Sequence, residues 1–297
     1  HLGIDVIGKN THSGQNQTLS IRGGRNRQVL ILIDGIRVSD PSRIDNDFDI
    51  NLLNIEMIES IEIVKGASST LYGSSAATGV VNIITKKAKK SIKLIVKRTW
   101  GTEQIANQSF DKINAGNQFV NLRGELFESG IGINLSYAER FSSGLSAVIG
   151  EEIDQFKKVN FNTGFNGKIG SQFNWQLNWS KADITSDYDN SFPLEDADFE
   201  FSTNLIRYGL NTQYKYTNGS LNLNAGLQKN KREYRSSFPT ISQSNYLNID
   251  FFNKYIFNNK FYSIAGIQYQ KEKMVATNDP ENYQTDIYLN SVYIDPS

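Results

Sequence analysis

The residue types that carry most enzyme and metal chemistry are scarce in this chain. Among its 297 residues there is no cysteine, and the two histidines, His1 and His12, lie near the start. Thiolate nucleophiles, disulfides and sites with several histidine ligands are therefore excluded over most of the chain. No G-x-S-x-G sequence occurs, and the paired carboxylates Asp187 and Asp189 fall in a predicted loop without rigid support. We therefore expect a protein that is not an enzyme.

Charge and hydropathy bear on two further classes, nucleic-acid-binding proteins and membrane proteins. Lys and Arg total 31 and Asp and Glu total 31, so the formal net charge is 0. Without an excess of positive charge, no nucleic-acid partner is expected. The longest apolar run covers 29–33, whereas a membrane-spanning helix needs about 20 apolar residues. A β-barrel is compatible with this pattern, because its apolar surface occupies only every second residue.

Residues 1–90 have the pattern of a small α+β domain. The β-branched run 29–33 predicts a strand buried on both faces, followed by a turn at 34–35 and a return strand over 36–38. The remaining expected elements are one or two helical turns over 49–57, a half-buried strand over 58–65, a turn and short helix over 66–72, a strand over 80–84 and a solvated basic joint at 86–90.

From residue 91 onward the hydrophobic period becomes 2. Trp175, Leu177 and Trp179, for example, alternate with Gln176 and Asn178, so one face is apolar and the other is rich in amides. This alternation predicts ten antiparallel strands, at about 92–101, 117–127, 131–141, 157–167, 172–186, 200–216, 220–236, 245–257, 260–274 and 283–297.

Short turns alternate with longer connections between these strands, as in a transmembrane β-barrel. A soluble β-sandwich also has alternating strands. The predicted strands exceed the usual ~5–6 residues, however, and their polar face suits a wet lumen. Aromatic residues near strand ends, among them Trp100 and Phe257, fit interfacial girdles. These features favour the barrel.

Five segments of the first region carry a resemblance to a known family. They read SIRGG at 20–24, VLILIDGIRV at 29–38, IESIEIVKG at 58–66, LYG at 71–73 and GVVNIIT at 79–85. In type, order and spacing they resemble the plug domain of TonB-dependent outer-membrane receptors. The barrel-like remainder of the chain is what that family places next.

The resemblance implies a plug domain over 1–90, truncated at its N-terminus, and the first part of a transmembrane β-barrel over 91–297. Barrels of plugged transporters have about 22 strands, so we expect further strands beyond the ten. The family's TonB box and first plug segment are expected before His1. The implied function is TonB-dependent uptake of a large, scarce nutrient across the outer membrane of a diderm bacterium, with the plug facing the periplasm. TonB, outer-membrane lipid and a small-molecule ligand are the implied partners.

Within the family, the segment VLILIDGIRVSDP at 29–41 most resembles the corresponding segment of the cobalamin receptors. Ferric siderophores are the alternative ligand. That branch binds calcium through acidic loop residues and requires no other cofactor. The resemblance places calcium on Glu152, Asp154, Asp189 and Asp198. These residues are equally consistent with solvated acidic loops. A passive porin or adhesin is the rival function of another class, although a porin has no folded domain ahead of its first strand.

Ligand is expected where the outer loops meet the apex of the plug, at Asp40, Ser42 and Arg43, together with Ser68 and Ser69 of the 67–70 loop. Tyr188 and Phe192 lie in a predicted loop and are candidates either for stacking on a flat ligand or for the aromatic girdle. The last set of predicted residues consists of Arg22, Arg37 and Lys65, which either pair with wall carboxylates or form a solvated plug face. We expect a wet, polar interface between plug and wall, which can shift without exposing a large apolar core.

Overall fold

The computed structural model describes residues 3–8, 14–66, 76–103, 112–127, 129–143, 148, 153–277 and 284–296. Its elements in chain order are β1 (Ile4–Ile7), β2 (Thr18–Ile21), η1 (Asn26–Gln28), β3 (Val29–Ile33), β4 (Ile36–Arg37), η2 (Ile50–Leu52), η3 (Ile55–Met57), β5 (Ile58–Lys65), β6 (Gly79–Thr85), β7 (Lys93–Gly101), β8 (Ala115–Glu125), β9 (Ile131–Ser143), β10 (Gln155–Ile169), β11 (Phe173–Ser191), β12 (Leu194–Tyr216), β13 (Gly219–Arg235), β14 (Thr240–Ile256), β15 (Tyr262–Thr277) and β16 (Gln284–Pro296).

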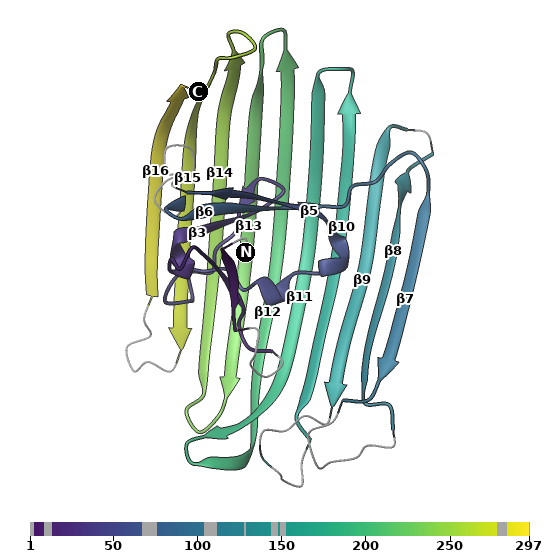
Figure 1. Cartoon of the computed structure of the whole chain (residues 1–297), viewed down its shortest axis with the longest axis vertical. Coiled ribbons are helices and arrows are strands. Elements are labelled where there is room, and N and C mark those ends of the chain that lie inside the picture. The colour runs from purple at the N-terminus through teal and green to yellow at the C-terminus, as the bar shows by residue number, and fades with distance from the viewer. Residues whose placement is uncertain are drawn as a thin grey trace.

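Strands β7 to β16 form one ten-stranded sheet in which each strand pairs with its neighbours in sequence (Figure 1). Every pairing in this sheet is antiparallel. The ten strands predicted from hydrophobic alternation are therefore confirmed, as is the fold class. Periodicity locates long strands well because the two faces of each strand lie in different environments, one apolar and one polar, over many residues.

The long loop predicted over 187–199 is wrong. Strand β11 continues to Ser191 and β12 begins at Leu194, so a strand hairpin extends through the acidic segment. Tyr188 pairs with Phe199 across this hairpin, and their ring centroids lie 5.6 Å apart. Asp and Glu have low strand propensity, and cross-strand pairing with the neighbouring strand outweighs it here.

The plug contains a four-stranded sheet in the order β4-β3-β6-β5 and a separate β1–β2 hairpin. Strand β3 is buried along its whole length, as its continuous apolar run predicts, and it pairs in parallel with β6. The expected half-burial of β5 is wrong, since Ile61 and Ile63 are exposed. Strand β5 lies at the edge of the sheet, where it pairs with β6 alone.

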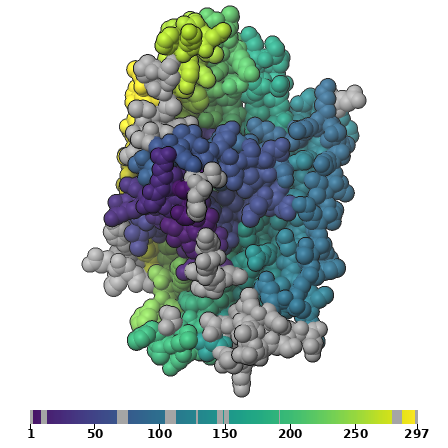
Figure 2. All heavy atoms as spheres, viewed as in Figure 1, coloured from purple at the N-terminus to yellow at the C-terminus, as the bar shows by residue number. Residues whose placement is uncertain are grey.

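The two faces of the ten-stranded sheet differ in chemistry. On the face that contacts the plug, here called the inner face, amides such as Asn160, Gln176 and Asn248 are buried, whereas Leu177 and Tyr208 on the outer face are exposed. Plug contacts extend from Lys97 of β7 to Glu272 of β15, so the sheet wraps around one domain. Figure 2 shows the plug across the middle of the sheet. In the part of the chain that the structure describes, no helix has the length and apolarity to cross a membrane.

The apolar core of the plug continues into the sheet. Ile33, Phe48 and Leu52 of the plug belong to the same buried cluster as Ile184 and Leu205 of strands β11 and β12. The expectation of a purely wet interface is therefore wrong in this region. The physical reason is that the apolar side chains Ile184 and Leu205 interrupt the row of amides on the inner face. Their proximity becomes visible only when the register of β11 and β12 is known.

Candidate functional site

The turn between β3 and β4 is bound to the barrel wall by side-chain amides. Asp34 and Gly35 form this turn with positive φ angles of 53° and 77°. Gln176 and Asn178 of β11 each donate to Asp34 Oδ2 at 3.2 Å. Asn211 of β12 donates to the carbonyl oxygen of Asp34 at 2.9 Å. Three amides from two wall strands therefore fix the position of one plug turn.

The residue after this turn fits a gap in the wall. Ile36 is 1% exposed, and Gly209 and Gly226 lie opposite each other in register on β12 and β13. A Cβ atom would come within 3.0 Å of Ile36 at Gly209 and within 2.5 Å at Gly226. Glycine is therefore required here because the plug side chain approaches the wall backbone closely. We call the wall residues Gln176, Asn178, Gly209, Asn211 and Gly226 the socket.

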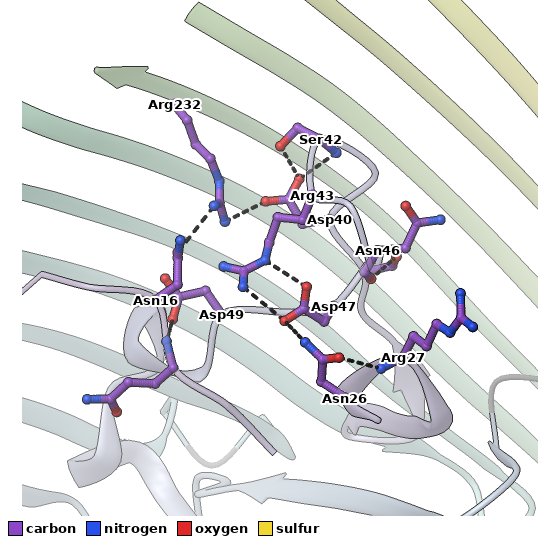
Figure 3. A network of polar contacts seen from close by, with 12 residues as sticks. Asn16, Asn26, Arg27, Asp40, Ser42, Arg43, Asn46, Asp47, Asp49 and Arg232 are labelled. Atoms are coloured by element: carbon purple, nitrogen blue, oxygen red, sulfur yellow. Dashed lines mark hydrogen bonds and ion pairs between the residues drawn. The ribbon is translucent and has the colours of Figure 1, made fainter. Parts of the chain in front are cut away.

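A buried ion pair joins the loop after β4 to the wall (Figure 3). Arg232 Nη2 of β13 lies 2.6 Å from Asp40 Oδ2, and the two side chains are 5% and 2% exposed. Ser244 of β14 donates its hydroxyl to Asp40 Oδ1 at 2.8 Å, and Arg232 also donates to Asn16. Asp40 therefore links this loop to two wall strands, and Arg232 links the same wall to the segment ahead of β2.

Two more carboxylates complete this polar network. Arg43 donates to both carboxylate oxygens of Asp47. Asp49 is fully buried and accepts from the backbone N–H groups of Gln17 and Asn51, so it caps η2. Burial raises the pKa of Asp49, while the two N–H groups and the guanidinium groups of Arg232 and Arg43 oppose that shift.

The three predicted plug cations divide between the two expected alternatives, contact with wall carboxylates and a solvated plug face. Arg37 is buried and lies within electrostatic range of Asp250 on β14. Arg22 and Lys65 are exposed.

The larger set of charges has the opposite polarity, with cations on the wall and carboxylates on the plug. Besides Arg232, Lys158 of β10 donates to the carbonyl oxygen of Leu53 at 2.9 Å, and Arg207 of β12 is 7% exposed. Sequence reasoning missed these wall cations. The sequence could have revealed them, because each of these cations occupies a position on the polar face of its alternating strand.

The residues predicted to bind ligand are engaged within the protein or lie elsewhere. Asp40 accepts from the N–H and hydroxyl of Ser42, and Arg43 pairs with Asp47. Ser68 and Ser69 lie outside the described residues. Tyr188 and Phe192 belong to the β11–β12 hairpin and its tip, where Phe192 is exposed.

The four residues predicted to bind calcium are also only partly described, because Glu152 lies outside the described ranges. Asp189 accepts from the backbone N–H groups of Val148 and Ala197, and Asp198 lies on β12. Within the described ranges, no group of three or more His, Cys, Asp or Glu side chains is placed to hold a metal ion. The calcium site therefore stays a prediction.

Residues 2–80 match the model of the TonB-dependent receptor plug domain. In this structure the matched segment lies against the inner face of an antiparallel sheet, to which it is bound by the socket and by the Asp40–Arg232 pair. The chain therefore contains a segment that matches this plug domain, followed by an antiparallel sheet like part of a receptor β-barrel.

Its similar proteins are described as transporters and receptors. The chain is 25% identical to the vitamin B12 transporter BtuB of Vibrio vulnificus over 88% of its own length and 41% of that protein. It is also 25% identical to BtuB of Photobacterium profundum over 94% of its length and 45% of that protein. The chain thus spans less than half the length of these relatives.

Solved structures with the same fold include siderophore receptors. PirA of Acinetobacter baumannii superposes with a TM-score of 0.76 at 19% identity, over 99% of this chain and 50% of that one. The ferric enterobactin receptor PfeA of Pseudomonas aeruginosa superposes with a TM-score of 0.73 at 14% identity, over 99% and 51%.

Proposed function

We propose that this chain serves in TonB-dependent uptake of a large, scarce nutrient across the outer membrane of a diderm bacterium. The observation that carries the proposal is a folded plug held against the inner face of a barrel wall by contacts from β7 to β15. A plug in this position closes the route along the wall. Passage of a ligand then requires the plug to move, and TonB is the partner that supplies the work.

A passive porin or adhesin has no use for such a domain. Three wall amides bind the β3–β4 turn, and a buried ion pair holds the next loop. A passive pore would gain nothing from these contacts, because they hold its lumen closed. They therefore support a gated receptor over a permanently open barrel.

Two classes of ligand are supported by different comparisons. The BtuB relatives favour a cobalamin, and the siderophore receptors with the same fold favour a ferric chelate. We propose the cobalamin class first, because whole-chain sequence similarity is more specific than a shared fold. The long-loop end of the sheet would face outward, and calcium bound by the acidic segments at that end is part of the same proposal.

Uptake measurements test the function and the ligand together. The intact receptor is expressed in cells with and without TonB, and labelled cyanocobalamin and a panel of labelled ferric siderophores are offered separately. We expect accumulation of one of these ligands only when TonB is present. Equal accumulation in cells that lack TonB would overturn the proposal, and accumulation of a siderophore alone would replace cobalamin by the second ligand class.

A further inference from the structure

Along six cross-strand rows beside the plug, the inner face of β10 to β13 carries charge of one sign only. Antiparallel pairing aligns the inward-pointing residues of these four strands in cross-strand rows. From the long-loop end to the short-turn end, the rows are Lys158-Ile184-Thr203-Arg232, Asn160-Ala182-Leu205-Asn230, Asn162-Ser180-Arg207-Gln228, Gly164-Asn178-Gly209-Gly226, Asn166-Gln176-Asn211-Asn224 and Lys168-Asn174-Gln213-Asn222. These rows all lie within the described range 153–277. They contain Lys158, Arg207, Arg232 and Lys168 and no carboxylate.

Carboxylates of the plug face the three wall cations that it covers. Asp40 forms the 2.6 Å ion pair with Arg232. Asp49 lies within electrostatic range of both Lys158 and Arg232, and Asp34 lies within range of Arg207. Buried cations need counter-charges, and in this closed arrangement the plug supplies them.

Arg207 retains donor capacity beyond this pairing. Its Nη1 has no hydrogen-bond partner among the described residues. The carboxylate of Asp34 already accepts from Thr85 as well as from the socket amides. A cavity of about 40 Å³ borders Arg207 and the plug residues Met57 and Ile58. A buried guanidinium with a free N–H group, on a residue that lines a cavity, is suited to an anionic group.

The same face continues into a polar chamber toward the short-turn end. This chamber has a volume of about 720 Å³ and is bounded on one side by the segment that joins plug and barrel. Its cations are Lys168 and three lysines of that segment, and its single carboxylate is Glu125. Most of the remaining lining consists of the amides Asn166, Asn174, Gln176, Asn211, Gln213, Asn222 and Asn224.

The neighbouring part of the wall has the opposite sign. Asp250 of β14 and Glu272 of β15 lie on the inner face, where Asp250 is within range of plug residue Arg37 and Glu272 accepts from Asn46. Beside the plug, the inner face is therefore cationic along β10 to β13 and anionic at Asp250 and Glu272, while Lys254 of β14 lies in register with Ser220 toward the short-turn end. An anion that passes beside the plug would be favoured along β10 to β13 and disfavoured along β14 and β15.

We propose that the inner face of β10 to β13 is an anion path, in which the plug carboxylates Asp34, Asp40 and Asp49 occupy positions that acidic groups of the ligand take when the plug moves. This inference rests on the proposed uptake function and assigns to its ligand at least one acidic group, a carboxylate or a phosphate, which a net-neutral ligand can also carry. When the plug withdraws, an anionic ligand replaces the lost counter-charges and stabilises the open state.

Hydrogen exchange of the intact receptor in detergent tests the path without TonB or the natural ligand. The readout is exchange of plug segment 29–38, and the probe is inorganic pyrophosphate, compared with sodium chloride at equal ionic strength. An anion that binds only the open state raises its population by the factor 1 + [L]/Kd, which is about threefold at twice the dissociation constant. We expect that acceleration with pyrophosphate and none with chloride.

Paired variants assign the effect to the inner face. Lys168→Gln combined with Arg207→Gln removes two inner cations, and Lys157→Gln combined with Lys181→Gln removes two outward-pointing lysines, which pair with Glu139 and Asp183. The inner variant should lose the pyrophosphate effect, and the outer variant should keep it. Lys168→Gln alone leaves every buried group in place and should reduce the effect partly.

Equal exchange in the two salts for the unaltered receptor would overturn the anion path, and so would an undiminished effect in the inner variants. Because no TonB is present in this experiment, these outcomes are independent of the uptake test. A receptor that fails to take up nutrient could still show the pyrophosphate effect. A receptor that takes up nutrient but shows no pyrophosphate effect would retain the uptake function and reject the acidic ligand.

Discussion

At the scale of single residues, the contact between plug and wall depends on buried polar groups. Asp40, Asp49 and Arg232 are all at most 4% exposed, so water contributes little to their solvation. These buried charges are therefore stabilised by one another and by the N–H and hydroxyl groups that donate to them. Removing one member leaves the others with an unpaired charge, which is more costly than losing a surface contact.

Arg232→Gln should destabilise the closed plug strongly. The substitution leaves Asp40 buried without its cation, and the expected loss is about 3–5 kcal/mol. Hydrogen exchange of segment 29–38 measures that loss as a rise in the opening equilibrium. The double variant Asp40→Asn with Arg232→Gln should lose less than Arg232→Gln alone, because neither charge is then orphaned.

Arg235→Gln on the same strand is the matched control. Arg235 pairs with Glu200 and Glu233, but its side chain is 61% exposed. Exposed pairs contribute about 0–1 kcal/mol, so plug exchange should change little. Equal effects of the two arginine variants would show that the buried pair has no special role.

Asp49 makes the stability of the plug depend on pH. Since burial raises its pKa above the ordinary 3.8, ionisation of Asp49 lowers the stability of the folded state. The stabilisation from the protonated form is fully present below pH 3.8 and is lost as pH rises through the raised value.

Asp49→Asn removes this pH dependence while its amide oxygen continues to accept from Gln17 and Asn51. The melting temperature of the variant relative to the unaltered protein should therefore increase between pH 4 and pH 7. Glu59→Gln, at an exposed position on β5, is the control and should show no such trend. A relative melting temperature that falls toward pH 7 would contradict the argument.

At the scale of elements, the β3–β4 hairpin and the socket determine where the plug lies against the wall. The turn has a conformation that glycine favours at Gly35, and it presents Asp34 and Ile36 to strands β11 to β13. Amides supply the polar contacts, and two paired glycines supply the space. The fit therefore depends on the register of three wall strands as well as on the plug sequence.

Gly226→Ala should push this hairpin away from the wall. The new Cβ atom would lie 2.5 Å from Ile36 Cγ2, and overpacking of this kind costs about 1–3 kcal/mol. Exchange of segment 29–38 should become faster. Combining Gly226→Ala with Ile36→Ala relieves the clash, so the substitution at 226 should cost less in that background. Gly101→Ala, where nothing lies within 4 Å of the added Cβ, should leave plug exchange unchanged.

At the scale of the whole molecule, the proposed uptake requires plug and wall to separate. Asn46 of the plug donates to Glu272 of β15 at 3.1 Å, two strands beyond the socket strand β13. Two cysteines at these positions, joined by a short bismaleimide, would fix the plug to the wall. We expect ligand binding to persist and uptake to stop. Asn46→Cys alone, treated with the same reagent, should transport normally, and undiminished uptake by the cross-linked receptor would show that this side of the plug need not move.

Hydrophobic alternation by itself determined the ten wall strands, because each strand separates an apolar surface from a polar one along its whole length. The motifs in 1–90 likewise predicted β3, β6 and the turn at Asp34. The acidic hairpin at 187–199 was missed because its residues favour loops locally, and only pairing with the neighbouring strand makes it continuous.

The identity of contacting partners was decided by the tertiary structure alone. Asp40 meets Arg232, and Ile36 meets Gly226, across separations in sequence that no local pattern constrains. Alternation assigns each of these residues to a face of its strand. Which plug atom lies opposite depends on the register of the wall strands, and that register exists only once the strands have paired and the plug lies against them.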